Sequence, residues 1–299
     1  MDRNLLGSLM MVFAMAAFAI EDMFIKRLAT DISTGQILMT LGVGGALFFG
    51  LLALRRGTRL FSVDLLLPAV LLRNLGEVIG TMGFVTAIAL TPLSSASAIL
   101  QATPLAVTLG AALFLGETVG WRRWSAILVG FAGVMLIIRP GLDGFQPASL
   151  FAVQGVIGLA MRDLATRATP ARIGAMQLSA YAFAMLVPTG LVLLLVQGHS
   201  LVDPAPAQWG ELAGAMLLGL MGYYAIVAAM RTGEVSVVTP FRYSRLIFAI
   251  IIGVWVFGER PDALTLIGAV LIVTSGLYTL LREARIRRRA RRTARAMAR

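Results

Sequence analysis

The sequence predicts an all-α integral membrane protein whose ten transmembrane helices form two inverted five-helix repeats. Three observations predict this fold class: an apolar composition, a chain that repeats itself, and apolar stretches separated by short polar breaks. Apolar residues make up 58% of the 299 residues, charged residues make up 14%, and the mean hydropathy is +0.85. A soluble protein carries about 25% charged residues, so this composition places the chain in a lipid bilayer.

The first half of the chain matches the second half at a nearly constant offset of 141 to 142 residues. Glu21-Asp22 with Lys26 returns as Arg162-Asp163 with Arg167, Gln36 returns as Gln177, and Leu115-Gly116-Glu117 returns as Phe257-Gly258-Glu259. Such self-similarity indicates a repeat architecture, which is typical of membrane transporters. We therefore divide the chain into a first repeat (1–141), a second repeat (142–281) and an Arg-rich cytoplasmic tail (282–299).

Apolar stretches long enough to cross a bilayer follow one another along the chain. A bilayer core about 30 Å thick needs about 20 helical residues. Stretches of that kind, broken by charged residues, Gly or Pro, lie at 5–27, 35–54, 65–89, 93–115, 121–138, 148–166, 173–196, 210–230, 235–257 and 263–281. Each repeat then holds five helices, an odd number, so the second repeat is expected to enter the membrane inverted.

Positive charge in alternate loops predicts the orientation, because cytoplasmic loops are enriched in Lys and Arg. With the N-terminus inside, the cytoplasmic side holds Arg3, Arg55, Arg56, Arg59, Arg122, Arg123, Arg167, Arg172 and Arg231. The outer side holds Lys26, Arg27, Arg139 and Arg260, and the tail adds nine further Arg. We therefore expect both termini on the cytoplasmic side of a bacterial inner membrane.

The formal net charge of +11 lies mostly in the tail, which directly follows an apolar stretch. This placement favours contact with anionic lipids and argues against nucleic-acid binding. The chain has no Cys and a single His, His199, so we expect no metal site, no cofactor and no catalytic triad. It also lacks a GxxxxGK[ST] motif. Uphill transport would therefore need an ion gradient, with a proton as the candidate coupling ion, or exchange.

Segments in both halves resemble the EamA branch of the drug/metabolite transporter superfamily. They read TPLSSA at 91–96, QATP at 101–104 and LGE at 115–117, then TPFRYSR at 239–245 and FGERP at 257–261. The resemblance implies ten helices, inverted five-helix repeats and a central cavity formed mainly by helices 1, 3, 4, 6, 8 and 9. It also implies transport, often export, of small polar or amphipathic metabolites such as amino acids, riboflavin, S-adenosylmethionine or metal-chelating compounds.

These features together predict a secondary transporter that works by alternating access and exports amino acids or related metabolites. Uptake of riboflavin or another vitamin or metabolite is the alternative within the transporter class. A membrane scaffold and an intramembrane enzyme are the alternatives outside it. An enzyme would need a clustered nucleophile, base or metal set, so we expect no enzymatic activity.

Ionisable residues inside membrane helices are costly and are functional candidates for that reason. Arg73 and Glu77 lie at i, i+4 in the predicted helix 65–89, on one face and close enough to pair. Glu77 falls about 18 Å into that helix, near the middle of the bilayer. Two interpretations remain open: a carboxylate that takes up a proton or binds a substrate ammonium group, and an internal ion pair that holds helices together.

Charges in the first and sixth predicted helices are related by the repeat. The gate or helix-end candidates there are Glu21, Asp22, Lys26, Asp163 and Arg167. Because Arg162, a cavity candidate, stands where the first repeat has Glu21, these two residues are candidates for opposite ends of a zwitterion. The alternative is that Asp22–Lys26 and Asp163–Arg167 form ordinary salt bridges near helix ends.

The fourth and ninth predicted helices supply further cavity candidates, Gln101, Thr103, Tyr243 and Arg245. Arg245 is a candidate anchor for a substrate carboxylate, because a guanidinium group binds carboxylates through two parallel hydrogen bonds. Contact between helices, or pairing with Glu77, is the alternative for Arg245.

Three further features complete the set of candidates. Arg242, one turn before Arg245, is a gate candidate, and Tyr223 in the eighth predicted helix is a cavity candidate. Glu117 and Glu259 follow Gly in matched turns, where they are expected to cap helix N–H groups. Small residues such as Gly76-xxx-Gly80 allow helices to approach closely, and Pro104 weakens its helix for bending.

Overall fold

The computed structural model describes residues 2–297 except 58–59, 61–62, 118–119, 143 and 171, and for 175, 235–236, 283 and 286–297 it describes the backbone alone. Arg59 of the orientation count and most side chains of the Arg-rich tail therefore lie outside the described residues. The described chain is helical and contains no strand.

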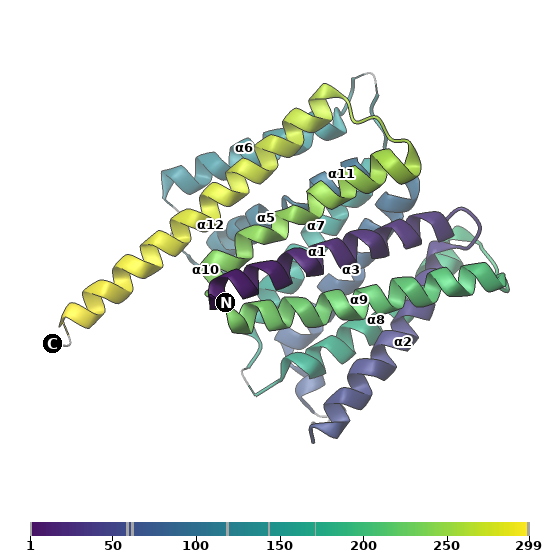
Figure 1. Ribbon diagram of the computed structural model, residues 1–299, viewed down its shortest axis with the longest axis horizontal. Coiled ribbons are helices and arrows are strands. Elements are labelled where there is room, and N and C mark those ends of the chain that lie inside the picture. Colours follow the sequence, from purple (N-terminus) through teal and green to yellow (C-terminus); the bar gives the residue numbers. More distant parts are fainter. Residues whose placement is uncertain are drawn as a thin grey trace.

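Long helices follow one another along the described chain (Figure 1). In the first half they are α1 (Arg3–Leu28), α2 (Thr34–Arg55), α3 (Pro68–Leu90), α4 (Leu93–Leu100), α5 (Thr103–Phe114) and α6 (Trp121–Ile138), with the short η1 (Val63–Leu66) before α3. In the second half they are α7 (Ser149–Ala168), α8 (Ala175–Gln197), α9 (Pro206–Thr232), α10 (Val235–Val238), η2 (Thr239–Tyr243), α11 (Ser244–Phe257) and α12 (Ala263–Met297).

Eight segments of the described chain are long and apolar enough to cross a membrane. They are Arg3–Leu28, Thr34–Arg55, Leu93–Phe114, Trp121–Ile138, Met176–Gln197, Pro206–Thr232, Thr239–Phe257 and Ala263–Arg282. The prediction of an all-helical, multi-pass membrane protein is therefore confirmed. The long helices α3 and α7 are not among the eight, and they carry Arg73, Glu77, Arg162 and Asp163 in their sequences.

Two stretches that were expected as single helices are interrupted. The predicted helix 93–115 is divided into α4 and α5 at Gln101-Ala102, and the predicted helix 235–257 passes through η2 before α11 begins. Pro104 lies in the first turn of α5 and Pro240 in η2. Proline lacks the N–H that a continuous helix requires, so each interruption lies beside a proline.

The helix predicted to end at residue 281 is also longer than expected. The helical backbone of α12 continues to Met297 and projects away from the other helices (Figure 1). Helix-forming Arg and Ala residues dominate that extension, which is consistent with their high helix propensity.

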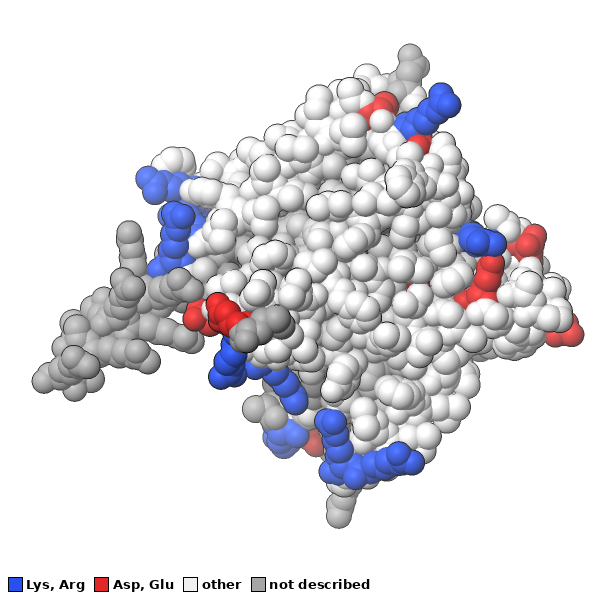
Figure 2. Space-filling model, viewed as in Figure 1, with Lys and Arg blue, Asp and Glu red and all other residues white. Residues whose placement is uncertain are grey.

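Helices of the first half pack mainly on helices of the second half. The most extensive pairs are α3 with α7, α2 with α8, α1 with α9, and α6 with α12, and Figure 1 shows α6 alongside α12 and α1 alongside α9. On the face drawn in Figure 2, charged residues gather towards the two ends of the helices and leave a broad uncharged band between them. Large apolar side chains such as Leu47, Leu128 and Trp255 are exposed, as a lipid-facing surface requires.

Candidate functional site

Four charged residues of α3 and α7 form one cluster, which we call the α3–α7 cluster. Arg73 Nη2 lies 3.6 Å from Glu77 Oε2, so the pairing expected from their i, i+4 spacing is confirmed. Glu77 Oε1 also lies 3.4 Å from Arg162 Nη1, and Arg162 Nη2 lies 2.8 Å from Asp163 Oδ1. Each charge of the cluster therefore has an opposite charge beside it. Because Arg73 and Glu77 are buried, such partners are needed to offset the cost of removing these charges from water.

Glycine places the two helices of this cluster close together. A methyl group built on Gly76 would lie 2.6 Å from the backbone nitrogen of Arg162, and one built on Gly80 would lie 2.8 Å from the backbone nitrogen of Leu159. Side chains larger than hydrogen would therefore push α3 away from α7. The close approach expected from Gly76-xxx-Gly80 is confirmed, and it brings the Glu77 carboxylate within reach of Arg162.

A second ion pair, the Asp22–Arg245 pair, joins α1 to α11. Arg245 Nη2 donates to both carboxylate oxygens of Asp22, at 2.9 Å and 2.7 Å, and Nε lies 3.2 Å from Oδ2. The rings of Phe18 and Phe84 lie 5.3 Å and 5.2 Å from the guanidinium carbon, where cation–π attraction adds to the pair. Arg245 therefore has a protein carboxylate as partner, and that partner is Asp22 rather than Glu77.

The helix-end pairs that spacing alone allows are replaced by partners on other residues. Asp22 pairs with Arg245, and Lys26 lies 3.7 Å from Glu259. Asp163 pairs with Arg162, and Arg167 lies 3.6 Å from Glu117. The expectation of Asp22–Lys26 and Asp163–Arg167 salt bridges was therefore wrong. For Asp22 the physical reason is that Arg245 offers two hydrogen bonds in a fixed planar geometry, which a lysine one turn away cannot match.

Arg242 has no ion pair within the described part of the chain. Its side chain is exposed, and it lies close enough to Asp163, Arg162 and Arg245 to interact with them electrostatically. The Gln101 side chain donates to the backbone oxygen of Arg242 at 3.4 Å. Gln101 therefore joins the interruption between α4 and α5 to η2. This hydrogen bond fixes the Arg242 backbone near the α3–α7 cluster and the Asp22–Arg245 pair.

The remaining cavity candidates lie at the edges of this arrangement. Thr103 donates to the backbone oxygen of Leu100 at 2.6 Å. The Tyr223 ring packs 5.1 Å from Phe49, and it lies near enough to Arg73 to interact electrostatically. Tyr243 is buried, with its hydroxyl against Gly276 of α12, and it lies close enough to the adjacent Arg242 to interact electrostatically.

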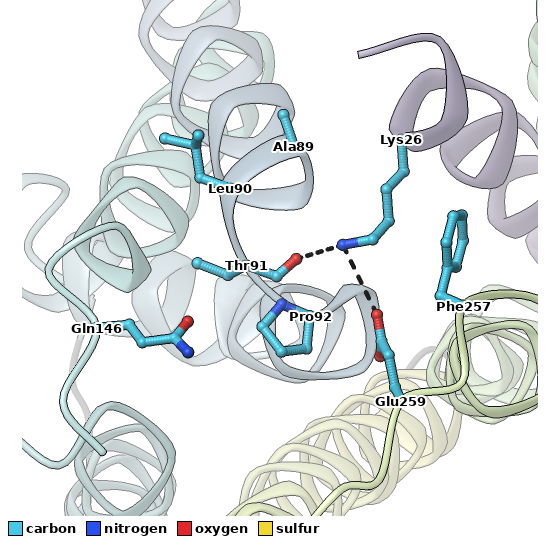
Figure 3. Close-up of a pocket in the computed structure, with 8 residues that line it drawn as sticks. All are labelled: Lys26, Ala89, Leu90, Thr91, Pro92, Gln146, Phe257 and Glu259. Carbon is cyan, nitrogen blue, oxygen red and sulfur yellow. Dashed lines mark hydrogen bonds and ion pairs between the residues drawn. The ribbon is translucent and has the colours of Figure 1, made fainter. Parts of the chain in front are cut away.

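At one end of the molecule Lys26 links three helices, in a group we call the Lys26 cluster: Lys26, Thr91, Ser94 and Glu259. Lys26 Nζ donates to the backbone oxygens of Ile88 at 3.1 Å and Thr91 at 2.5 Å, at the end of α3. Figure 3 shows the Lys26 amine between Thr91 and the Glu259 carboxylate, in a pocket of about 350 Å³ that Phe257 also lines.

Glu259 caps the first turn of α4 from the other half of the chain. Its carboxylate accepts from the backbone nitrogens of Leu93 at 2.5 Å and Ser94 at 3.0 Å, and from the Ser94 hydroxyl at 2.6 Å. A carboxylate at a helix N-terminus compensates free N–H groups and the helix dipole. Glu259 was expected to cap a helix, but sequence spacing gave no sign that the helix would be α4.

The mates of Lys26 and Glu259 in the repeat are Arg167 and Glu117, which form the Arg167 pair. Their side chains are 48% and 46% exposed, against 16% and 9% for Lys26 and Glu259. Both Glu residues follow a glycine with positive φ, 65° at Gly116 and 64° at Gly258, so the two turns share one backbone form. The side chains in these matched turns therefore differ in exposure and in their contacts, although the two glycines share one backbone form.

Two further observations bear on chemistry. Among the described residues, no group of three or more His, Asp or Glu is placed to hold a metal ion. Outside the spans, Asp262 accepts hydrogen bonds from Arg139 and from the backbone nitrogen of Thr265. These bonds lower the pKa of Asp262 to about 2.

A family model for the EamA-like transporter family matches residues 5–139 and again 146–281. The chain belongs to the EamA-like transporter family. The two matched segments cover most of both halves, as the family resemblance of the sequence motifs led us to expect. Membership assigns the chain to transporters, and with the apolar spans it identifies a multi-pass membrane protein.

Bacterial relatives carry several different substrates in their names. The chain is 31% identical to a riboflavin transporter of Vibrio cholerae over 75% of each protein. It is 27% identical to an S-adenosylmethionine uptake transporter of Rickettsia conorii over 71% of each, and 28% identical to the pseudopaline exporter CntI of Pseudomonas aeruginosa over 90% of this chain and 94% of that protein. The shared property is transport of a small metabolite.

A solved crystal structure has the same fold. It aligns with a TM-score of 0.61 at 20% identity, covering 94% of this chain and 98% of the other. At that identity the likeness bears on the fold alone.

Proposed function

We propose that this protein is a secondary transporter that exports amino acids or related small metabolites across a bacterial inner membrane by alternating access. The observation that carries the proposal is the position of Arg242 in η2, near enough to both the α3–α7 cluster and the Asp22–Arg245 pair to interact with them. These charged groups lie on α1, α3, α7, η2 and α11, and two interrupted helices lie beside them. Groups of both signs there suit a zwitterionic solute, and interrupted helices at corresponding positions of two halves are typical of transporter binding sites.

The finer architecture of the proposal is ten spans in two inverted repeats, residues 1–141 and 142–281. The packing of the helices supports it. The repeat offset carries α1 to α7 and α3 to α9, so the α1–α9 pair becomes the α7–α3 pair. The same offset exchanges α2 with α8 and α6 with α12, so each of these two pairs maps onto itself. This is the pattern that a two-fold axis relating the halves produces, and the odd number of proposed spans in each repeat is the argument for placing that axis in the membrane plane.

The difference between the two ends supports the proposal of alternating access. The Lys26 cluster is closed around Glu259, while the Arg167 pair is half-exposed. With both termini cytoplasmic, the Lys26 end is the outer end, where the charged groups are tightly joined beside the pocket of about 350 Å³, and the inner end is more loosely joined. Transport would require the reverse arrangement, in which the Lys26 cluster separates and the Arg167 end closes.

The candidate residues fall into three roles in this proposal. Arg242, Gln101, Thr103 and Tyr223 contact or border the solute. The α3–α7 cluster and the Asp22–Arg245 pair hold the cavity walls, with Tyr243 packed behind them. Lys26 and Arg167 control the two ends. A proton is the proposed coupling ion, and anionic lipids are the proposed contacts of the Arg-rich tail.

Riboflavin uptake is the second candidate function. The Vibrio cholerae relative, 31% identical, is named as a riboflavin transporter. Riboflavin would be bound mainly by apolar and aromatic side chains such as Tyr223, and less by the charged groups.

Counterflow in proteoliposomes tests the proposal. Proteoliposomes that contain the purified protein are loaded with unlabelled threonine, methionine, phenylalanine or riboflavin. Entry of the same labelled compound is then measured, with protein-free vesicles as the control. Exchange of an amino acid supports the proposal, and exchange of riboflavin alone supports the second candidate. A folded protein that exchanges no member of the panel would contradict both.

A further inference from the structure

The Glu21 carboxylate is the one charged group of the central α1 segment whose surroundings in the described structure contain no partner. It is half-buried on α1, and no hydrogen bond or ion pair joins it to any described residue. The nearest groups that act on it electrostatically are Asp22 and Arg245. Arg245 is already bound by both oxygens of Asp22, so it is not available to Glu21.

A glycine of α9 leaves the space in which this carboxylate lies. A methyl group built on Gly219 would be 2.6 Å from Glu21 Oε1 and 3.1 Å from Oε2. Any side chain at residue 219 would therefore collide with the carboxylate. The α9 surface that faces Glu21 here consequently presents backbone and no charge.

The other half of the molecule holds an ion pair at the same place. The repeat offset carries Glu21 to Arg162, and an offset of 142 residues carries Glu77 to Gly219. Arg162 and Glu77 lie 3.4 Å apart, and their mates Glu21 and Gly219 are in contact. The correspondence is supported by the next turn, where Gly80 contacts Leu159 and its mate Gly222 contacts Phe18. Glu21 therefore occupies one side of an ion-pair position whose other side is glycine.

We propose that Glu21, seated against Gly219, binds the ammonium group of a transported amine or amino acid. The inference rests on the proposed function and adds the subsite and the charge of the group that it recognises. A carboxylate with no partner in a membrane helix is costly, and a solute cation compensates it where the other half uses an internal pair. When no solute is bound, a proton satisfies the same carboxylate, so amine and proton compete for Glu21.

The competition has a definite sign. Raising the pH removes the proton from Glu21 and leaves the carboxylate free, so the affinity for an amine rises with pH. The charged groups that face Glu21 are Asp22 on its own helix and Arg245 on α11, and α9 contributes Gly219. Because Asp22 and Arg245 compensate each other, neither substitutes for the missing cation.

Direct binding to the purified full-length protein tests this subsite without requiring transport. The probes are labelled phenethylamine, which carries only an ammonium group, and 3-phenylpropionate, which carries only a carboxylate. Glu21→Gln is expected to weaken phenethylamine binding at least tenfold, about 1.4 kcal/mol, and to leave 3-phenylpropionate unchanged. Gly219→Ala is expected to do the same by displacing the carboxylate, so the test does not depend on one variant.

Gly214→Ala is the matched control, since a methyl group there meets only the Phe24 ring of α1, at 3.1 Å. It should leave both probes unchanged. Equal phenethylamine affinity in the wild type and Glu21→Gln, or no phenethylamine binding by the wild type, overturns the proposal. Loss of pH dependence in Glu21→Gln with amine affinity retained overturns it too, because Glu21 would then serve a proton alone. Counterflow of an amino acid would still support the proposed function in each of these cases.

Discussion

Matched positions in the two halves of this protein make different contacts. Asp22 pairs with Arg245 on a separate helix, whereas its mate Asp163 pairs with the adjacent Arg162. The side chains of Lys26 and Glu259 are mostly covered, whereas those of Arg167 and Glu117 are half-exposed. Two halves that are alike in sequence and backbone but unlike in contacts are what one state of an alternating transporter requires. Under the proposed alternating access, the other state would separate the Lys26 end and join the helices at the Arg167 end.

The largest expected difference concerns the mates Asp22 and Asp163, whose ion-pair partners are Arg245 and Arg162. Arg245→Ala leaves Asp22, whose side chain is 4% exposed, without an ion-pair partner, and such a loss costs about 3–5 kcal/mol. Arg162→Ala should cost less, because Glu77 keeps Arg73 and Asp163 keeps the nearby Arg242. Thermal unfolding in detergent, together with counterflow, measures both variants.

Removal of both partners sharpens the same comparison. The double variant Asp22→Asn/Arg245→Ala should recover much of the stability that Arg245→Ala loses, because no buried charge remains unpaired. If Arg245→Ala alone left both stability and counterflow at wild-type values, the Asp22–Arg245 pair would have neither a structural nor a transport role.

A smaller difference is expected between the two ends. Glu259→Ala removes charge-assisted hydrogen bonds to Leu93 and Ser94 and a partner of Lys26. Such bonds contribute about 1.5–3 kcal/mol each, so the joined arrangement of the Lys26 end should become less populated and counterflow should fall about tenfold or more. Glu117→Ala removes a half-exposed pair at 3.6 Å, which contributes about 0–1 kcal/mol.

The two Glu→Ala variants serve as matched controls for each other when their unfolding temperatures are measured in one assay. Equal effects of Glu259→Ala and Glu117→Ala on unfolding temperature would contradict the assignment of a tightly joined Lys26 end and a loosely joined Arg167 end. A larger effect of Glu117→Ala would reverse that assignment.

The smallest expected effect is at Asp262, which lies at the Lys26 end and has glycine, Gly120, as its mate. Its pKa is lowered to about 2 by Arg139 and by the Thr265 backbone, so its stabilisation is present above the unfolded value of about 3.9. It is lost as the pH falls towards 2. The side chain is 51% exposed, and solvent screening limits the contribution to about 1 kcal/mol.

Thermal unfolding of the wild type and Asp262→Asn between pH 5 and pH 2 measures this contribution. The difference in unfolding temperature should be present at pH 5 and should vanish towards pH 2. A difference that stays constant over this range would show that the charge of Asp262 does not stabilise the fold.

The sequence predicts local features of this protein better than contacts between its halves. The spans, the Arg73–Glu77 pair and the close approach at Gly76 and Gly80 depend on helix period and residue size, which can be read along one segment. Pro104 also indicated a weakened helix, although the interruption at η2 was not predicted.

Contacts between the halves depend on which helices pack together. Nothing in the spacing of Lys26 or Glu259 indicates that both reach the junction of α3 and α4, nor that Asp22 meets Arg245. One signal was available in hindsight. Four charged positions repeat in register, which indicates that the two halves use the same places, but it does not indicate which helix supplies each partner.

The distance between labels at each end tests the central claim most directly. The chain has no Cys, so spin labels can be placed on Leu90→Cys/Trp255→Cys at the Lys26 end and, at the repeat mates, on Thr232→Cys/Leu113→Cys at the Arg167 end. With a solute that the counterflow panel identifies as transported, alternating access predicts that the first distance lengthens while the second shortens. Two distances that stay fixed, or that change in the same direction, during active exchange would contradict it.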